Sequence, residues 1–155
     1  MTIFTIITAG FFGTLAMTLT MGLIHTLGLA NADMVRAIGS LYTRKSENAF
    51  WPGALVHFGA GCLFAFLYAV VGGYAPVQTG AAKILIMTMV GTFHGLAMGM
   101  ILTVAVAEYH PLEQFRKAGA DVVISHIVGH VVYGFFVGLI FAMARLDLHL
   151  MRVFS

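Results

Sequence analysis

Long apolar segments alternate with short polar links along the whole chain. Four segments, residues 4–29, 54–74, 81–107 and 122–144, consist almost entirely of apolar and small residues. Each is at or above the ~20 residues that cross the hydrocarbon core of a bilayer as a helix. The pattern predicts an all-α, polytopic membrane protein, a bundle of four transmembrane helices. Because the links are short, we expect the chain to form a single transmembrane domain.

Two of the links contain amphipathic pieces. Residues 32–42 place their apolar side chains on one helical face and Arg36 on another, and Asn31 or Asp33 precedes them as a helix cap. Residues 111–118 show a similar but shorter pattern that begins with a proline. We expect both pieces to lie at the membrane surface.

The two halves of the chain resemble each other. The first and third segments share the pattern Gly-x-Phe-x-x-Leu-Ala-Met, which begins at Gly10 and again at Gly91. In the second and fourth segments a histidine, His57 or His130, is followed by small residues at four-residue intervals. The repeat predicts that the bundle is built from two tandem helical hairpins.

Composition and charge support the membrane interpretation and exclude other classes. Hydrophobic residues make up 60% of the 155 residues and charged residues 9%, whereas about a quarter of the residues of a soluble domain are charged. The net charge of +2 is too small and too dispersed for nucleic-acid binding. Cys62 is the only cysteine, which excludes an intrachain disulfide and a thiolate cluster.

Histidines are the main ionisable residues within the apolar segments. In an antiparallel bundle they all lie near the two amphipathic links or near the middle of the membrane. At ~1.5 Å per residue, the depths from that side are roughly 6 Å for His25, 8 to 10 Å for His57 and His126, 15 Å for His130 and 20 Å for His94. Because a charge at membrane depth costs roughly 2.5 to 3.5 kcal/mol, each such residue is a functional candidate.

Four of these histidines are expected to converge on the interior: His57, His94, His126 and His130. One interpretation is a cofactor or metal site, because imidazole binds zinc, copper and iron, and histidines four residues apart share a helix face. Glu108 would then be an oxygen ligand or a partner of a ligating histidine. A second interpretation is a relay for protons or metal ions. A third is interhelical hydrogen bonding alone, worth ~0.6 kcal/mol per contact.

Haem b is one cofactor that the histidine positions allow. It needs two axial ligands from facing helices at similar depth, which His57 with His126 or His94 with His130 would supply. Both pairs fall in one half of the membrane, so two haems stacked across the bilayer are not expected. A site with copper, zinc or iron bound by three or four of the histidines fits the sequence equally well.

Several short motifs carry a resemblance to known sequences. They are Ala16-Met17-Thr18, His57-x-x-x-Gly61, Glu108-x-His110-Pro111 and His126-x-x-x-His130-x-x-Tyr133-Gly134. In these motifs the chain resembles an uncharacterised group of small bacterial four-helix membrane proteins. The resemblance covers most of the chain and implies the fold, but it implies no activity.

The leading functional hypothesis is an accessory or electron-transfer subunit of a larger respiratory or photosynthetic membrane complex, with a histidine-ligated haem or metal. Its partners would be the lipid bilayer and other membrane subunits, and the links are too short for an independent enzyme. The first alternative is a small transporter or channel in which the histidines relay protons or metal ions. The second is a purely structural subunit.

Basic residues predict the orientation. Five lie in the links on the histidine side (Arg36, Arg44, Lys45, Arg116, Lys117) and three on the other side (Lys83, Arg145, Arg152). By the positive-inside rule the histidine side is cytoplasmic. We therefore expect a multi-pass protein of the bacterial inner membrane with both termini in the periplasm.

Overall fold

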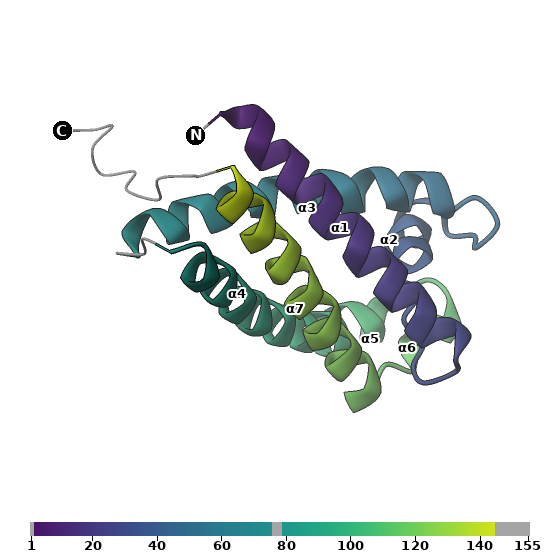
Figure 1. The fold of residues 1–155 in the computed structure, drawn as a ribbon. Coiled ribbons are helices and arrows are strands. Elements are labelled where there is room, and N and C mark those ends of the chain that lie inside the picture. The colour runs from purple at the N-terminus through teal and green to yellow at the C-terminus, as the bar shows by residue number, and fades with distance from the viewer. Residues whose placement is uncertain (1, 76–78, 145–155) are drawn as a thin grey trace.

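The computed structural model describes residues 2–75 and 79–144, without the side chains of residues 105 and 106. Within these ranges the chain is helical and contains no β-strand. The elements, shown in Figure 1, are α1 (Ile3–Thr26), α2 (Met34–Thr43), α3 (Phe50–Tyr74), α4 (Gly80–Ile101), a π-helical segment (Leu102–Val106), α5 (Ala107–Tyr109), α6 (Glu113–Arg116) and α7 (Ala120–Met143).

Four helical runs are long and apolar enough to cross a membrane. They are α1, α3, the continuous run from α4 through α5, and α7. The expectation of an all-helical chain with four apolar helices of this length is confirmed. In Figure 1 the start of α1, the end of α7, the end of α3 and the start of α4 lie at one end of the bundle, and α2, α5 and α6 at the other. Arg145 and Arg152, which were counted for the orientation, lie outside the described residues.

The most extensive helix contact in the bundle is between α4 and α7, where glycines on both helices let the backbones approach. A Cβ atom at Gly91 would meet the carbonyl oxygen of His130, and one at Gly134 would meet the carbonyl oxygen of Met87. Small residues allow van der Waals contact between backbones where large side chains would hold them apart. This contact fixes the position of α7, and with it the histidines that α7 carries.

α1 completes the core by packing along α7 and α3. Thr14 faces Gly61 of α3, and Met17 and Met21 pack against Gly129 of α7. Both predicted hairpin pairs, α1 with α3 and α4 with α7, are therefore in contact. Because α1 also packs along α7, the halves do not form separate units, and the duplication itself stays a prediction.

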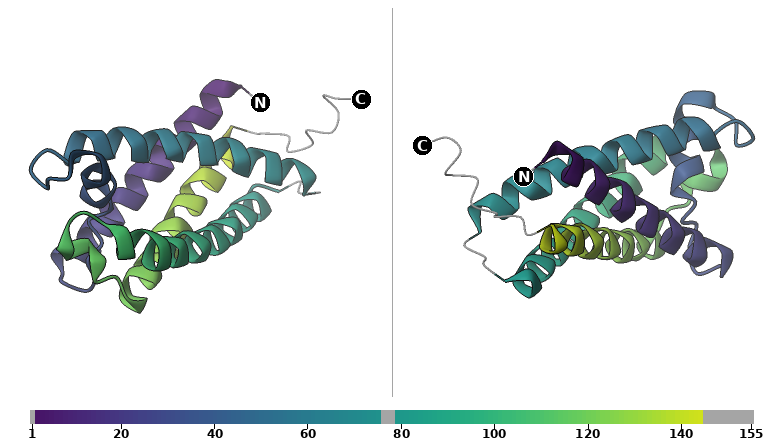
Figure 2. Two further views of the ribbon diagram at one scale, coloured as in Figure 1. Left: turned by 180° about the vertical axis from the view of Figure 1, so that it is seen from behind. Right: turned by 45° about the horizontal axis from the view of Figure 1, so that its top comes forward.

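α3 and α4 diverge from their connection. They make few contacts with each other, and the two views in Figure 2 show them close together at the connection and apart at their other ends. α2 packs against the N-terminal end of α3, where α3 and α4 are far apart. There a Cβ atom at Gly39 of α2 would meet the backbone at the start of α3, and one at Gly53 of α3 would meet the backbone of α2. The space between α3 and α4 is therefore bordered by α2 at one end.

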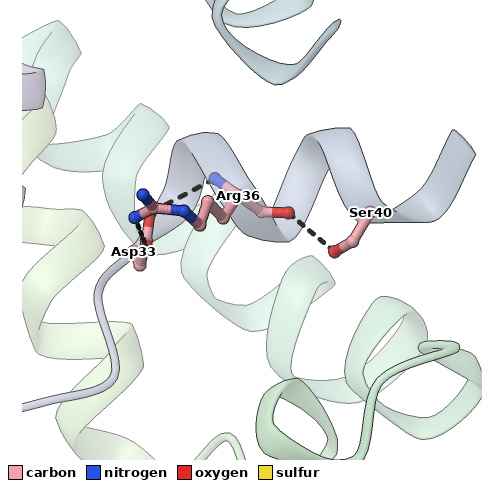
Figure 3. A network of polar contacts seen from close by, with 3 residues as sticks. All are labelled: Asp33, Arg36 and Ser40. Carbon is pink, nitrogen blue, oxygen red and sulfur yellow. Dashed lines mark hydrogen bonds and ion pairs between the residues drawn. The ribbon is translucent and has the colours of Figure 1, made fainter. Parts of the chain in front are cut away.

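The start of α2 is determined by its cap. Asp33 Oδ1 accepts a hydrogen bond of 3.2 Å from the backbone N–H of Arg36, and Asp33 Oδ2 forms an ion pair of 2.9 Å with the Arg36 guanidinium (Figure 3). A carboxylate in this position satisfies a free N–H group and complements the helix dipole. The Ser40 hydroxyl donates a hydrogen bond of 2.6 Å to the Arg36 carbonyl oxygen one turn later.

The second amphipathic piece is shorter than predicted, since its helix α6 covers only Glu113–Arg116 of residues 111–118. It is fastened to α2 by His110, which is fully buried. His110 Nε2–H donates to the Ala37 carbonyl oxygen at 3.0 Å, and its Nδ1 accepts from the Leu112 N–H at 3.1 Å. Both hydrogen-bonding positions of this imidazole are therefore used for structure.

Two helix boundaries differ from the hydrophobic pattern for local reasons. The first helix ends at Thr26 rather than 29, because Gly28 adopts a φ of 69° and the Leu29 N–H bonds to the Ile24 carbonyl oxygen at 3.1 Å. A glycine in this left-handed conformation is a usual helix stop. The second helix begins at Phe50 rather than 54, because Pro52 falls in its first turn, where proline is tolerated.

The third apolar helix also departs from the regular geometry expected over residues 81–107. After Ile101 the chain forms five π-helical residues, Leu102–Val106, and then continues as α5 to Tyr109. π-Helical turns hold one more residue per turn than α-helix and are often found near functional sites. Leu102 lines the pocket described below.

Candidate functional site

The four histidines predicted to converge line one pocket. It has a volume of about 270 Å³ and its wall is mostly apolar, with residues from α1, α2, α3, α4 and α7 and with Leu102. The histidines are His57, His94, His126 and His130. The structure therefore brings together all four candidate histidines from three helices, as their positions on the helix faces predicted.

The two histidines of α7 are fixed by their own helix. His126 Nδ1–H donates to the Val122 carbonyl oxygen at 2.8 Å, and His130 Nδ1–H donates to the His126 carbonyl oxygen at 2.9 Å. Because a carbonyl oxygen can only accept, these bonds determine that Nε2 of each neutral ring is the acceptor. The two rings are stacked with centres 6.2 Å apart. Both side chains are buried.

His94 of α4 links this pair to α3. Its ring centre lies 4.4 Å from that of His130, in an edge-to-face contact. Its Nδ1 shares a hydrogen bond of 3.1 Å with the Tyr68 hydroxyl. The Nε2 atoms of His94 and His126 are buried and have no hydrogen-bond partner among the described residues. Such a nitrogen costs about 1 to 3 kcal/mol relative to a paired one, so these two atoms are candidates for binding a proton or a ligand.

His57 of α3 connects two pockets. It is half-buried and lines the histidine pocket together with a neighbouring pocket of about 230 Å³. That second pocket, which we call the polar mouth, lies where α1 meets α2 and includes His25, Asp33 and Arg36. His57 therefore stands between the polar end of the bundle and the three histidines deeper in it.

The remaining polar candidates lie away from the pocket. Glu108 is exposed on α5 and does not line the pocket, so its position does not bring it to the histidines. His110 serves the α2 contact described above, and His25 is exposed in the polar mouth. The position of Glu108 gives no support to its predicted role as a metal ligand.

Sequence reasoning missed two tyrosines of the site. Tyr133 lines the pocket and donates a hydrogen bond of 2.6 Å to the Gly61 carbonyl oxygen, joining α7 to α3. Tyr68 contacts both His94 and Tyr133, with ring centres 5.9 and 5.3 Å apart. Tyr68 follows His57 by eleven residues, which is close to three helical turns. The spacing therefore indicates that Tyr68 and His57 lie on the same face of the helix.

The geometry fits a metal or haem only in part. Among the described residues, no three histidine, cysteine, aspartate or glutamate side chains are arranged to hold a metal ion. The His94 and His130 ring centres are 4.4 Å apart, whereas rings on opposite faces of one iron need about 6 Å at metal–nitrogen bonds of about 2 Å. In this arrangement that pair does not frame a haem iron.

The fold and the pocket define a helical protein with four helices of membrane-spanning length and a histidine-lined pocket between them. No family model, no curated protein and no solved structure matches the chain.

Proposed function

We propose that the chain is an integral membrane protein in which the histidines form a pathway for protons, as part of a small transporter or channel. The observation that carries this proposal is the position of His57, which lines both the polar mouth and the histidine pocket. A proton that enters from water beside Asp33 and His25 can therefore reach the buried histidines through the His57 imidazole. Imidazole suits this role because it takes a proton on one nitrogen and releases one from the other.

Beyond His57 the pathway continues through neighbouring rings. The ring centres are 6.2 Å apart from His126 to His130, 4.4 Å from His130 to His94, and 5.9 Å from His94 to Tyr68. Tyr68 lies 11 residues after His57 in α3, or about 16.5 Å along the helix axis. The series thus covers about half of the ~30 Å hydrocarbon core of a bilayer.

The hydrogen bonds favour a pathway over a purely structural role. Histidines that hold helices together should bond across helix interfaces. Of the four pocket histidines, only His94 does so among the described residues, through Tyr68. His126 and His130 bond to carbonyl groups of their own helix, which leaves their Nε2 atoms for exchange with a mobile species.

Proton flux into liposomes tests the proposal. Liposomes containing the protein and an internal pH dye should acidify faster than empty liposomes when valinomycin and a potassium gradient impose a membrane potential. The variant His57→Leu should reduce this flux to the level of empty liposomes, because it closes the polar mouth to the pocket with an apolar side chain of similar size. The control His25→Leu should retain most of the flux, since His25 is exposed. Equal flux from wild-type and empty liposomes would refute the pathway.

A second candidate function, the binding of a transition-metal ion by an electron-transfer subunit, is favoured by the α7 pair. His126 and His130 lie one turn apart with Nδ1 held on carbonyl oxygens, the usual preparation of a ligating imidazole. Met17, Met34 and Met98 line the same pocket and would add soft thioether ligands suited to copper(I). Elemental analysis of the purified protein should then find one metal per chain, lost in the double variant His126→Leu/His130→Leu. A metal content near zero in the wild type after copper loading would eliminate this candidate.

The place of the chain in a respiratory or photosynthetic complex, and its insertion in the bacterial inner membrane with periplasmic termini, stay predictions. The first is supported by the many exposed phenylalanine and leucine side chains on the outer faces of α1 and α3. Lipid alone would also cover these faces. The native mass after mild detergent extraction distinguishes a complex with other subunits from a chain covered only by lipid.

A further inference from the structure

The histidine pocket is open toward the side of the bundle as well as toward the polar mouth. Its wall includes residues of both α3 and α4, the two helices that diverge from their connection. Val56 is 39% exposed there, and His57 and His94 are each half-buried. If the four apolar helices cross a bilayer as proposed, this side faces hydrocarbon. A molecule that enters between α3 and α4 is therefore one that dissolves in lipid.

The wall of the pocket limits the chemistry of such a molecule. Among the described residues it contains no lysine, arginine, aspartate or glutamate, so these offer no counter-charge for a lipid phosphate. The Thr14 hydroxyl donates to the Gly10 carbonyl oxygen and the Tyr133 hydroxyl to the Gly61 carbonyl oxygen. The described polar groups left for a neutral ligand with hydrogen-bonding oxygens are the ring of His57, the Tyr42 hydroxyl and the Nε2 atoms of His94, His126 and His130.

The size of the pocket further limits which ligand it can hold. Sites for drug-sized molecules span about 300 to 1,000 Å³, and the volume of about 270 Å³ lies just below that range. One substituted six-membered ring fits such a volume, whereas a fused macrocycle such as haem does not. Phe64 and Tyr133 supply aromatic faces in the same wall, against which a planar ring packs favourably.

We propose that this pocket binds the headgroup of a lipid-soluble quinone or quinol, which enters between α3 and α4. His130 Nε2 accepts a hydrogen bond from a quinol hydroxyl at the inner end of the pocket. His57 bonds the opposite oxygen near the polar mouth, and the isoprenoid tail stays in the hydrocarbon outside. Only binding is proposed, which goes beyond the proton pathway. The bound headgroup would lie beside that pathway.

Binding of decylubiquinol, kept reduced under anaerobic conditions, to the full chain in lipid nanodiscs tests the proposal. We expect saturable binding that weakens by about tenfold or more in each of His57→Leu and His130→Leu, because each removes one hydrogen bond to the headgroup. His25→Leu, outside this pocket, should bind as the wild type does. Helical circular dichroism and gel filtration verify that each variant is folded.

Competition with decylbenzene, which has the ring and tail but no oxygens, gives a test on the unmodified protein. Decylbenzene should displace decylubiquinol poorly. Equal displacement, binding unchanged in the His57→Leu/His130→Leu double variant, or no saturable binding would each overturn the proposal. Phospholipid that competes as well as unlabelled decylubiquinol would also overturn it. Proton flux is measured without quinone, so failure here and failure of the proton pathway are distinguishable.

Discussion

Gly91→Ala is expected to destabilise the protein by about 1 to 3 kcal/mol, the usual cost of overpacking a tight contact. The new methyl group would meet the His130 carbonyl oxygen and lie near the Gly134 backbone, neither of which can rotate away. α4 and α7 would have to separate. Unfolding in a titration with sodium dodecyl sulfate, followed by circular dichroism, measures the change.

Gly59→Ala is the matched control for this variant. Gly59 also lies within a long helix, α3, but a Cβ atom there meets nothing within 4 Å. Because alanine restricts the unfolded chain more than glycine does, this variant should be neutral or stabilised by up to about 1 kcal/mol. The two substitutions are chemically identical, so effects of equal sign and size would show that the α4–α7 contact is not the close backbone contact described here.

The second large effect is expected for His130→Leu in the proton-flux assay. His130 is the middle ring of the series, in contact with His126 on one side and His94 on the other. Leucine has similar bulk but neither accepts nor donates a proton, so flux should fall to that of empty liposomes. Since the imidazole bonds only to its own helix, the fold should persist, as circular dichroism would verify.

Tyr68→Phe and Tyr74→Phe refine this result within one helix. The first removes the hydroxyl that bonds His94, and the second removes a hydroxyl from a residue that is 73% exposed near the end of α3. We expect reduced flux in Tyr68→Phe and wild-type flux in Tyr74→Phe. A His130→Leu protein with normal helicity and normal flux would exclude the ring series as the route.

The hydrophobic pattern was sufficient to predict the helices, because a bilayer-length apolar run has few ways other than a helix to satisfy its backbone. Four-residue spacing also predicted that His57 and His130 face the interior, and both line the pocket. The helix ends were harder to predict. Gly28 and Pro52 indicated them, but the long apolar run next to each residue conceals where the helix begins or ends.

The shape of the pocket could not be predicted from the pattern. It depends on the angle between α3 and α4 and on the position of α2, which packs against one end of α3 through Gly39 and Gly53. Such contacts join residues far apart in sequence and leave no periodic signal. The pattern also could not decide whether Glu108, expected at the membrane boundary, reaches the histidines; its side chain is exposed.

The π-helical residues Leu102–Val106 change the angular phase of the helix between its two functional ends. An α-helix advances about 100° per residue, whereas a π-helical turn takes up an additional residue without a matching advance. As a result His94 faces the pocket, Glu108 and Tyr109 point to the exterior, and His110 reaches Ala37. The five π-helical residues thus set the angle, measured about the helix axis, between His94 in the pocket and the residues at the end of the helix.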